Sequence, residues 1–158
     1  QDNSVSWFNW KLVEKNVDLV RFTQALIKFR RKQPTVRSKR FLRGISSGGK
    51  PAELLWFSAV GTAVNWEDDQ ALVCLLTTPD DQDDPHGDGR DVLLMFNATN
   101  APRDFILSQS ARDKRWGLLV DTAESSPRDI FPNANGPAPP PTGRINLSPR
   151  SLRCYVGR

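Results

Sequence analysis

Residues 1–34 read QDNSVSWFNWKLVEKNVDLVRFTQALIKFRRKQP and join an aromatic-rich opening to an amphipathic helix. Apolar residues recur at i, i+3, i+7 and i+10, a spacing that places them on one side of a helix. They are Leu19, Phe22, Leu26 and Phe29. Asn16 is the expected N-cap, and Pro34 is expected to end the helix. Val20 and Ile27 widen the apolar side, so we expect it to pack against more than one layer.

After Arg37 the pattern changes to short β-like runs separated by turn residues. Strands are predicted at 40–43, 53–58, 71–77, 92–97, 105–107, 116–120, 145–147 and 152–156. The proline-rich segment 125–142 is predicted to be irregular. The predicted fold class is therefore mainly β, an antiparallel β-sandwich of about eight strands preceded by one amphipathic α-helix.

The positive charge of the chain is concentrated between Lys28 and Arg43, within a net charge of +4. Binding of single-stranded nucleic acid requires aromatic side chains between the basic ones, as stacking surfaces. Only Phe29 and Phe41 interleave here, and Phe29 belongs to the apolar side of the helix. We therefore favour a basic helix end followed by a solvated strand, and expect no nucleic-acid partner.

The cysteines and the hydropathy of the chain bear on its location. Cys74 and Cys154 lie in apolar strand-like runs, and two cysteines are too few for a disulfide framework, so buried free thiols in a reducing compartment are expected. No apolar run approaches the ~18 residues of a membrane span, and no signal peptide opens the chain. The prediction is a cytoplasmic protein without a membrane partner. Since Met95 is the only methionine, we interpret the chain as an excised fragment.

Several motifs follow one another in a recognisable order. They are Gln1 to Asn3, Ser6 to Trp10, Asp18 to Phe22 and Leu26 to Pro34, then more weakly Leu54 to Phe57, Leu93 to Ala98, Phe105 to Leu107 and Arg150 to Leu152. The first four resemble the run QDN-x-x-SWFDW…DLLRF…LIxLRRxHP of isoamylase-type glycogen debranching enzymes, in the α-amylase superfamily. The resemblance covers nearly the whole chain. It departs at Asn9, where the family has Asp, and at Gln33, where the family has His.

In that family the run follows the last strand of a catalytic (β/α)8 barrel and leads into a C-terminal β-domain. The resemblance implies that residues 1–35 are the loop and last helix of a barrel outside this chain, and that 36–158 are the C-terminal β-sandwich. It implies a parent enzyme that hydrolyses α-1,6-glucosidic branch linkages in glycogen or limit dextrin, in glycogen catabolism, with retention. The implied partners are the barrel and, through the parent, branched α-glucan.

Glycoside hydrolysis needs two carboxyl groups flanking the scissile bond. The glutamates of the chain match none of the catalytic motifs of the superfamily; they are Glu14, Glu53, Glu67 and Glu124. The resemblance begins after those motifs and implies that the catalytic Asp, Glu and Asp lie upstream. The chain alone is therefore predicted to be inactive, with no catalytic residue and no cofactor.

An acidic run between Asp80 and Asp91, with His86, has the composition of a hard-cation site. An EF-hand beginning at Asp84 requires a bidentate Glu at its twelfth position, where Met95 stands. The motif does not fit, so we favour a solvated excursion and predict no metal site, with bound calcium as the alternative.

Asp2, Asn3 and Trp7 are the candidate carbohydrate-binding residues, with Phe8 and Trp10 beside them. A loop after the last barrel strand lies on the active-site face, and aromatic rings stack on sugar faces. For the two tryptophans we favour the alternative that they pack the junction between barrel and sandwich.

Three further tryptophans, Trp56, Trp66 and Trp116, are predicted to lie in the core. One of them on an exposed sheet face would instead be a secondary sugar platform. An exposed aromatic row on one sheet face would indicate a stand-alone carbohydrate-binding module, rather than the structural role that we favour for the sandwich. We also expect the isolated chain to self-associate, because the barrel-facing side of the segment 19–29 is apolar.

Overall fold

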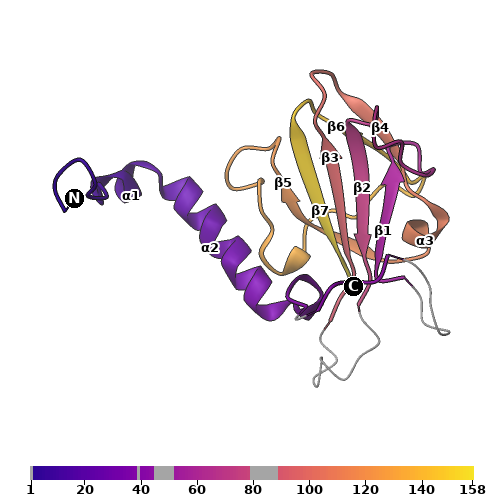
Figure 1. Ribbon diagram of the computed structural model, residues 1–158, viewed down its shortest axis with the longest axis horizontal. Helices are drawn as coiled ribbons and strands as arrows, with labels where there is room; N and C mark the ends of the chain where they lie inside the picture. Colours follow the sequence, from indigo (N-terminus) through magenta and orange to yellow (C-terminus); the bar gives the residue numbers. More distant parts are fainter. Residues whose placement is uncertain (1, 39, 45–51, 79–88) are drawn as a thin grey trace.

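The computed structural model describes residues 2–38, 40–44, 52–78 and 89–158, and Figure 1 gives its ribbon. Its elements are α1 (Lys11–Lys15), α2 (Val17–Lys32), the 3-10 turn η1 (Pro34–Val36), β1 (Leu54–Ser58), β2 (Ala71–Leu76), β3 (Val92–Asn97), β4 (Arg103–Ile106), α3 (Gln109–Arg112), β5 (Trp116–Asp121), the 3-10 turn η2 (Pro132–Ala134), β6 (Arg144–Leu147) and β7 (Ser151–Gly157). The described residues form seven strands in two antiparallel sheets, so the mainly β prediction is confirmed.

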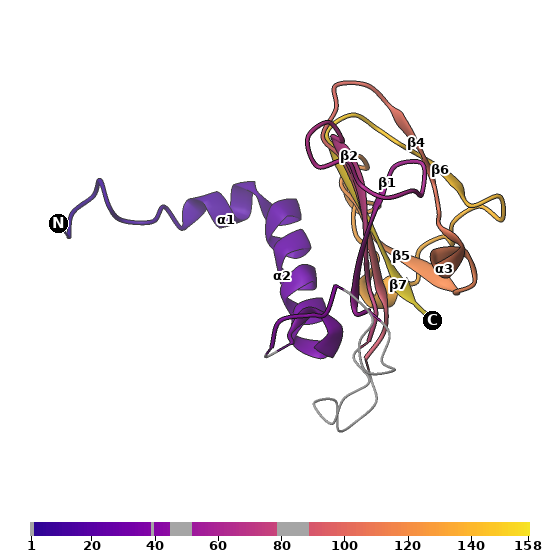
Figure 2. The same ribbon diagram turned by 45° about the vertical axis from the view of Figure 1, so that its right-hand side comes forward.

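The larger sheet has the strand order β1-β2-β3-β7-β5, and the smaller one pairs β4 with β6. Figure 2 shows α2 on one side of the larger sheet and the smaller sheet on the other, so the chain forms three layers. Residues paired across antiparallel strands point to the same side of a sheet. The larger sheet therefore has an inner face toward β4 and β6 and an outer face toward α2.

The main hydrophobic core lies between the inner face of the larger sheet and the smaller sheet. Leu75, Leu93 and Met95 of the larger sheet are fully buried in one cluster with Phe105 and Leu147 of the smaller sheet. Alternate residues of β2 and β3 supply this face, which is why two nearly continuous apolar runs can serve both sides of the sheet.

Helix α2 covers part of the outer face. Its Phe22, Leu26 and Phe29 pack on a second cluster, to which the larger sheet contributes Leu119 and Val156 among others. Three of the four residues predicted on the apolar side thus pack on the sheet, whereas Leu19 is 63% exposed. Among the described residues, no helix has the length and apolar character needed to cross a membrane.

The ends of α2 agree with the prediction, but the side chain of Asn16 does not form the predicted N-cap hydrogen bond. Its side chain makes no cap hydrogen bond to α2. Instead its Nδ2 donates to the carbonyl oxygen of Leu12 at 2.7 Å. Asn16 therefore closes the last turn of α1 and sets the break between the two helices, and Pro34 opens the 3-10 turn that follows α2.

The strand predicted at 40–43 is wrong. The backbone of this segment joins no sheet ladder; the carbonyl oxygen of Arg43 accepts from the N–H groups of both Glu53 and Leu54. The Arg43 N–H donates to the Glu53 carboxylate at 3.0 Å. A side-chain acceptor thus replaces the ladder partner that a β-like residue pattern implied.

The prediction that three tryptophans lie in the core holds for one of them. Trp116 is buried, and its Nε1 donates to the Ala111 carbonyl oxygen at 2.6 Å. Trp56 is on β1 but 36% exposed, and Trp66 is outside any strand and 66% exposed. The turn at Gly61, where φ is +79°, carries the chain from β1 toward the Trp66 loop.

Candidate functional site

The three predicted carbohydrate-binding residues lie together in one turn at the start of the chain. The indole Nε1 of Trp7 donates to the Asp2 carboxylate at 2.5 Å. The Asn3 carbonyl oxygen accepts from the Trp7 N–H at 3.1 Å, and the Asn3 side chain accepts from the Val5 N–H at 3.0 Å. Local hydrogen bonds thus hold Asp2, Asn3 and Trp7 as a unit.

This N-terminal turn projects away from the sheets (Figure 1). Trp7 and Trp10 are 63% and 76% exposed, and Phe8 meets Trp10 edge to face with ring centroids 5.0 Å apart. Phe8 and Trp10 therefore pack on each other, and all three rings keep most of their surface exposed in the described chain. Stacking on sugar and packing on a barrel remain the two predicted roles.

A second group of aromatic rings lies on the outer face of the larger sheet. Trp56 pairs with Cys74 on β2, in the row that continues through Leu94 to Cys154, so its ring is on the same face as α2. Trp66 packs edge to face on Trp56, at a centroid distance of 5.6 Å and an interplanar angle of 73°. We call these two rings with Phe96, 6.4 Å from Trp56, the outer-face aromatic cluster.

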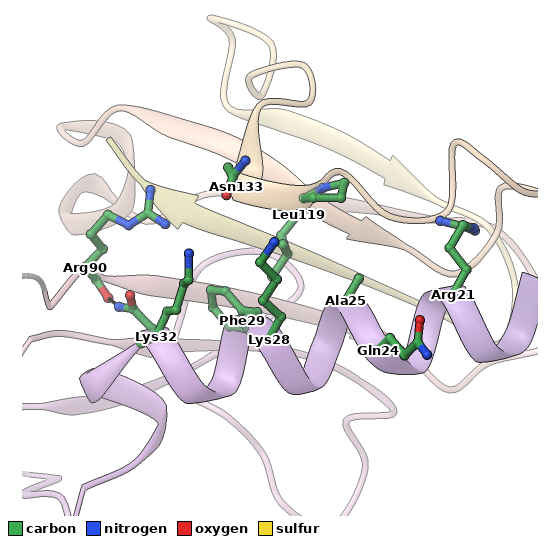
Figure 3. Close-up of a pocket in the computed structure, with 11 residues that line it drawn as sticks. Arg21, Gln24, Ala25, Lys28, Phe29, Lys32, Arg90, Leu119 and Asn133 are labelled. Atoms are coloured by element: carbon green, nitrogen blue, oxygen red, sulfur yellow. Dashed lines mark hydrogen bonds between the residues drawn. The ribbon is translucent and has the colours of Figure 1, made fainter.

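A cleft of about 480 Å³ opens between α2 and the β5 end of the larger sheet. Figure 3 shows the side chains of Lys28, Lys32 and Arg90 extending toward Asn133 and Leu119. We call it the basic cleft. No local sequence pattern reveals this cleft, because residues 28, 90 and 133 meet only through the packing of α2 on the sheet.

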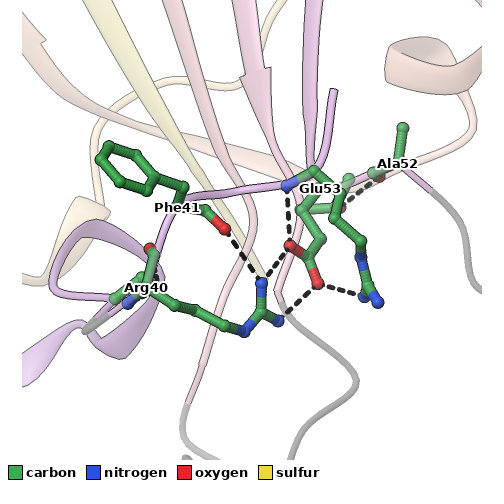
Figure 4. A network of polar contacts seen from close by, with 7 residues as sticks. Arg40, Phe41, Ala52 and Glu53 are labelled. Carbon is green, nitrogen blue, oxygen red and sulfur yellow. Dashed lines mark hydrogen bonds and ion pairs between the residues drawn. The ribbon is translucent and has the colours of Figure 1, made fainter. Parts of the chain in front are cut away.

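Glu53 has a structural role in the described chain. It is 1% exposed, and its carboxylate accepts from the Arg40 guanidinium at 2.7 and 2.8 Å and from Arg43 (Figure 4). The Arg40 guanidinium, helped by the N–H and side chain of Arg43, holds the pKa of Glu53 down to about 2, against the effect of burial. An anion held this firmly cannot act as a general acid or base near neutral pH.

The other buried carboxylate and the thiols are similarly occupied. Asp121 is 2% exposed and pairs with Arg153 at 2.5 Å. Cys74 and Cys154 are buried and free, as predicted, and Leu94 on the strand between them pairs with both. Two strand spacings separate them by roughly 10 Å, too far for a disulfide. Burial raises the pKa of Cys74 to about 11 and that of Cys154 to about 12, so neither is a reactive thiolate.

The acidic run containing His86 lies outside the described residues apart from Asp91. That carboxylate accepts from the Thr78 N–H at 2.7 Å and pairs with Lys114. In the described ranges, no three His, Cys, Asp or Glu side chains gather closely enough to hold a metal ion. The calcium alternative is untested by this structure.

The arrangement defines a class of protein: an antiparallel two-sheet β-domain with a helix packed across its outer face. No protein-family model matches the chain. Among curated proteins it is 29% identical over 134 residues to the glycogen operon protein GlgX homolog of Mycobacterium tuberculosis, covering 77% of this chain and 18% of the relative. It is 30% identical over 132 residues to the chloroplastic isoamylase 3 of Oryza sativa subsp. japonica, covering 83% and 15%, and 25% identical over 128 residues to an isoamylase of a Flavobacterium species, covering 77% and 16%.

These matches confirm the resemblance seen in the sequence. The chain is related to the isoamylase-type glycogen debranching enzymes, and it spans less than a fifth of the length of the curated relatives it matches.

Proposed function

We propose that this chain is a non-catalytic C-terminal β-domain of an isoamylase-type debranching enzyme. Residues 1–35 are assigned to the loop and last helix of its (β/α)8 barrel, and 36–158 to the sandwich. The longer enzyme is assigned hydrolysis of α-1,6-glucosidic branch linkages in glycogen or limit dextrin. The two buried free thiols favour a cytoplasmic location.

The observation that carries this proposal is the two-sided character of α2. Its sheet-facing side is packed, while apolar residues on its outward side remain open: Val17 is 63%, Leu19 63% and Ile27 54% exposed. With about 100° per residue, these three side chains spread over nearly half of the helix circumference rather than along one narrow stripe. An exposed apolar side of this kind is typical of a surface that another layer covers. A barrel against it gives α2 the two-layer packing that its wide apolar side predicts.

The non-catalytic assignment is supported by the carboxylates. Glu53 and Asp121 are paired with arginines, and the exposed Glu124 pairs with Arg128 in the turn that follows β5. A retaining glycosidase needs two carboxyl groups about 5 Å apart on either side of a sugar. We therefore expect no release of reducing ends when the chain alone is incubated with a branched maltooligosaccharide.

A binding experiment tests the docking. The chain is mixed with the portion of the Mycobacterium tuberculosis homolog outside the matched segment, and complex formation is followed by analytical ultracentrifugation. We expect association that Leu19→Lys with Ile27→Lys abolishes. Val60→Lys is the matched control, because Val60 is equally apolar and 59% exposed but lies in the turn after β1. Association that survives the helix variant, or no association at all, contradicts the proposal.

The same helix variant bears on self-association. The wild-type chain is expected to form oligomers at high concentration in light scattering, and Leu19→Lys with Ile27→Lys to return it to a monomer. A monomeric wild-type chain counts against self-association through the exposed side chains of Leu19 and Ile27.

The outer-face aromatic cluster supports a second candidate, glucan binding by the sandwich itself. Trp66 presents most of its ring to solvent, but the steep angle between it and Trp56 lets only one of the two lie flat on a sugar. Titration with a branched maltooligosaccharide, followed by tryptophan fluorescence and NMR, distinguishes the sites. Loss of binding in Trp66→Ala places the sugar on the sheet; loss in Trp7→Ala places it at the N-terminal turn. No response at millimolar sugar leaves the sandwich with the structural role alone.

A further inference from the structure

The basic cleft is a concave site that has no role in the proposed docking of α2 on a barrel. Its volume of about 480 Å³ lies within the range of about 300–1,000 Å³ that is usual for small-molecule sites. It opens on the flank of α2 that carries Lys28 and Lys32, between the helix and the β5 end of the larger sheet. Ile27 lines a neighbouring hollow with the same two lysines, so a partner seated on Leu19 and Ile27 borders the cleft.

Three positive charges line this cleft without a compensating carboxylate among the described residues. Lys28 and Lys32 are one helical turn apart on α2, and Arg90 reaches the same space from the segment before β3 (Figure 3). Within the residues that the structure describes, none of the three forms an ion pair. Arg21, at the far end, differs because it pairs with Asp129 at 2.5 Å.

A buried side chain joins the two elements that carry the three cations. Gln33 is 2% exposed, and its side-chain amide donates to the Arg90 backbone carbonyl oxygen, which ties the end of α2 to the start of β3. The same amide donates to the Thr35 hydroxyl at 3.1 Å. Like charges held on two connected elements repel one another, and a bound anion relieves that repulsion.

The remaining walls favour an anion that carries an apolar or ring-shaped body. The half-buried ring of Phe29 lines the cleft with Ala25 and Pro132, and Leu119, which is only 2% exposed, contributes to the same wall. Asn133, whose φ of +70° is uncommon for a residue other than glycine, offers a neutral amide at the rim. Cations at one end and an aromatic ring at the base suit a charged head attached to a flat body.

We propose that the basic cleft binds a phosphomonoester carried on a sugar or nucleoside ring. The phosphate dianion lies among Lys28, Lys32 and Arg90, whose charged N–H groups match its three terminal oxygens. The attached ring lies on Phe29. A phosphate carries nearly two negative charges at neutral pH, which distinguishes it from a single carboxylate as the counterion of three cations.

The test is isothermal titration of the 158-residue chain at low salt with four probes: glucose 6-phosphate, adenosine 5′-monophosphate and their unphosphorylated parents. We expect saturable one-to-one binding of at least one phosphorylated probe and none of its parent. The tighter of the two tells whether the ring is a hexose or a nucleoside. NMR shifts of Phe29 and Leu119 locate the bound ring, and affinity should fall below about pH 6, where the phosphate takes up a proton.

Variants separate this site from general attraction to a basic chain. Lys28→Gln and Arg90→Gln should each weaken binding about tenfold, the effect of losing one charge-assisted hydrogen bond. Lys15→Gln removes the same charge from exposed α1 and should leave the affinity within about twofold. Circular dichroism and thermal unfolding show that each variant is folded; the lysine and the arginine are both exposed enough to replace without opening the core.

Three results overturn the proposal. The first is equal binding of phosphorylated and unphosphorylated probes, or binding of neither. The second is an equal loss of affinity in Lys15→Gln and Lys28→Gln, which indicates only a diffuse positive field. The third is steeply salt-dependent binding of single-stranded DNA without binding of either small phosphate, which favours a polyanion surface.

Discussion

The two faces of the larger sheet differ in how completely this chain covers them. On the inner face, Leu75, Leu93 and Met95 are fully buried by the smaller sheet. On the outer face, α2 covers only the β5 side, and the aromatic cluster around Trp56 stays partly open. Alternate residues of the same apolar strands supply the two faces, so residue composition does not tell which face is covered. The comparison teaches that the inner face forms a closed core within the described chain, whereas the outer face keeps aromatic and apolar side chains partly exposed.

The largest expected effect comes from neighbouring residues of β3 that point to opposite faces. Leu93→Ala should lower the free energy of unfolding by about 3–4 kcal/mol, because the inner core cannot collapse around the cavity. Leu94→Ala, on the half-covered outer face, should cost about 1–2 kcal/mol. Urea denaturation measures both. Equal losses would show that the outer face is as fully packed as the inner one.

The next effect compares the two sides of α2. Phe29→Ala should lower the free energy of unfolding by about 2 kcal/mol, since its ring is partly buried on the sheet. Ile27→Ala should change it by less than about 0.5 kcal/mol, because the side chain is exposed and alanine favours the helix. Hydrogen exchange of the α2 amides should accelerate only in the Phe29 variant. Faster exchange in both would mean that the outward side already has a partner.

The smallest expected effect concerns the edge of the sheet at β1, where Glu53 is held. Its folded-state pKa of about 2 is below the ordinary value of 4.5, so the stability it contributes is fully present above about pH 4.5. That contribution should be lost as the pH falls from about 4.5 toward 2. Glu53→Gln should cost about 1–2 kcal/mol at pH 7 and flatten this part of the pH profile.

Thermal unfolding of the wild-type chain and of Glu53→Gln, measured as a function of pH, tests this prediction. Glu67→Gln, which changes an exposed carboxylate, is the control and should keep the acid-dependent loss. An unchanged pH profile in Glu53→Gln would mean that other carboxylates set the acid stability of the domain.

Much of the fold could be predicted from local patterns. The predicted limits of the helix, Asn16 and Pro34, enclose the observed helix α2. Seven of the predicted runs are strands, with small shifts at their ends. The run 40–43 was misassigned because its backbone is held by the Glu53 side chain, a contact from ten or more residues away. Trp66 was misplaced because its loop carries it onto the outer face rather than into a strand.

The two candidate sites also differ in whether their residues are close together in the sequence. Asp2, Asn3 and Trp7 are close in sequence, and local hydrogen bonds indeed bring them together, although their role stays a prediction. The basic cleft joins residues separated by more than fifty positions, so no local pattern reveals it.

The sequence by itself determined the kinship with isoamylase-type enzymes, the mainly β fold and the amphipathic helix, because periodicity and motif order are local properties of the chain. Only the tertiary structure decided which side of α2 is packed, which tryptophans are buried and where Lys28, Lys32 and Arg90 meet. Those outcomes depend on strand register and on the packing of α2 across the sheet, and both are set by contacts between residues far apart in sequence.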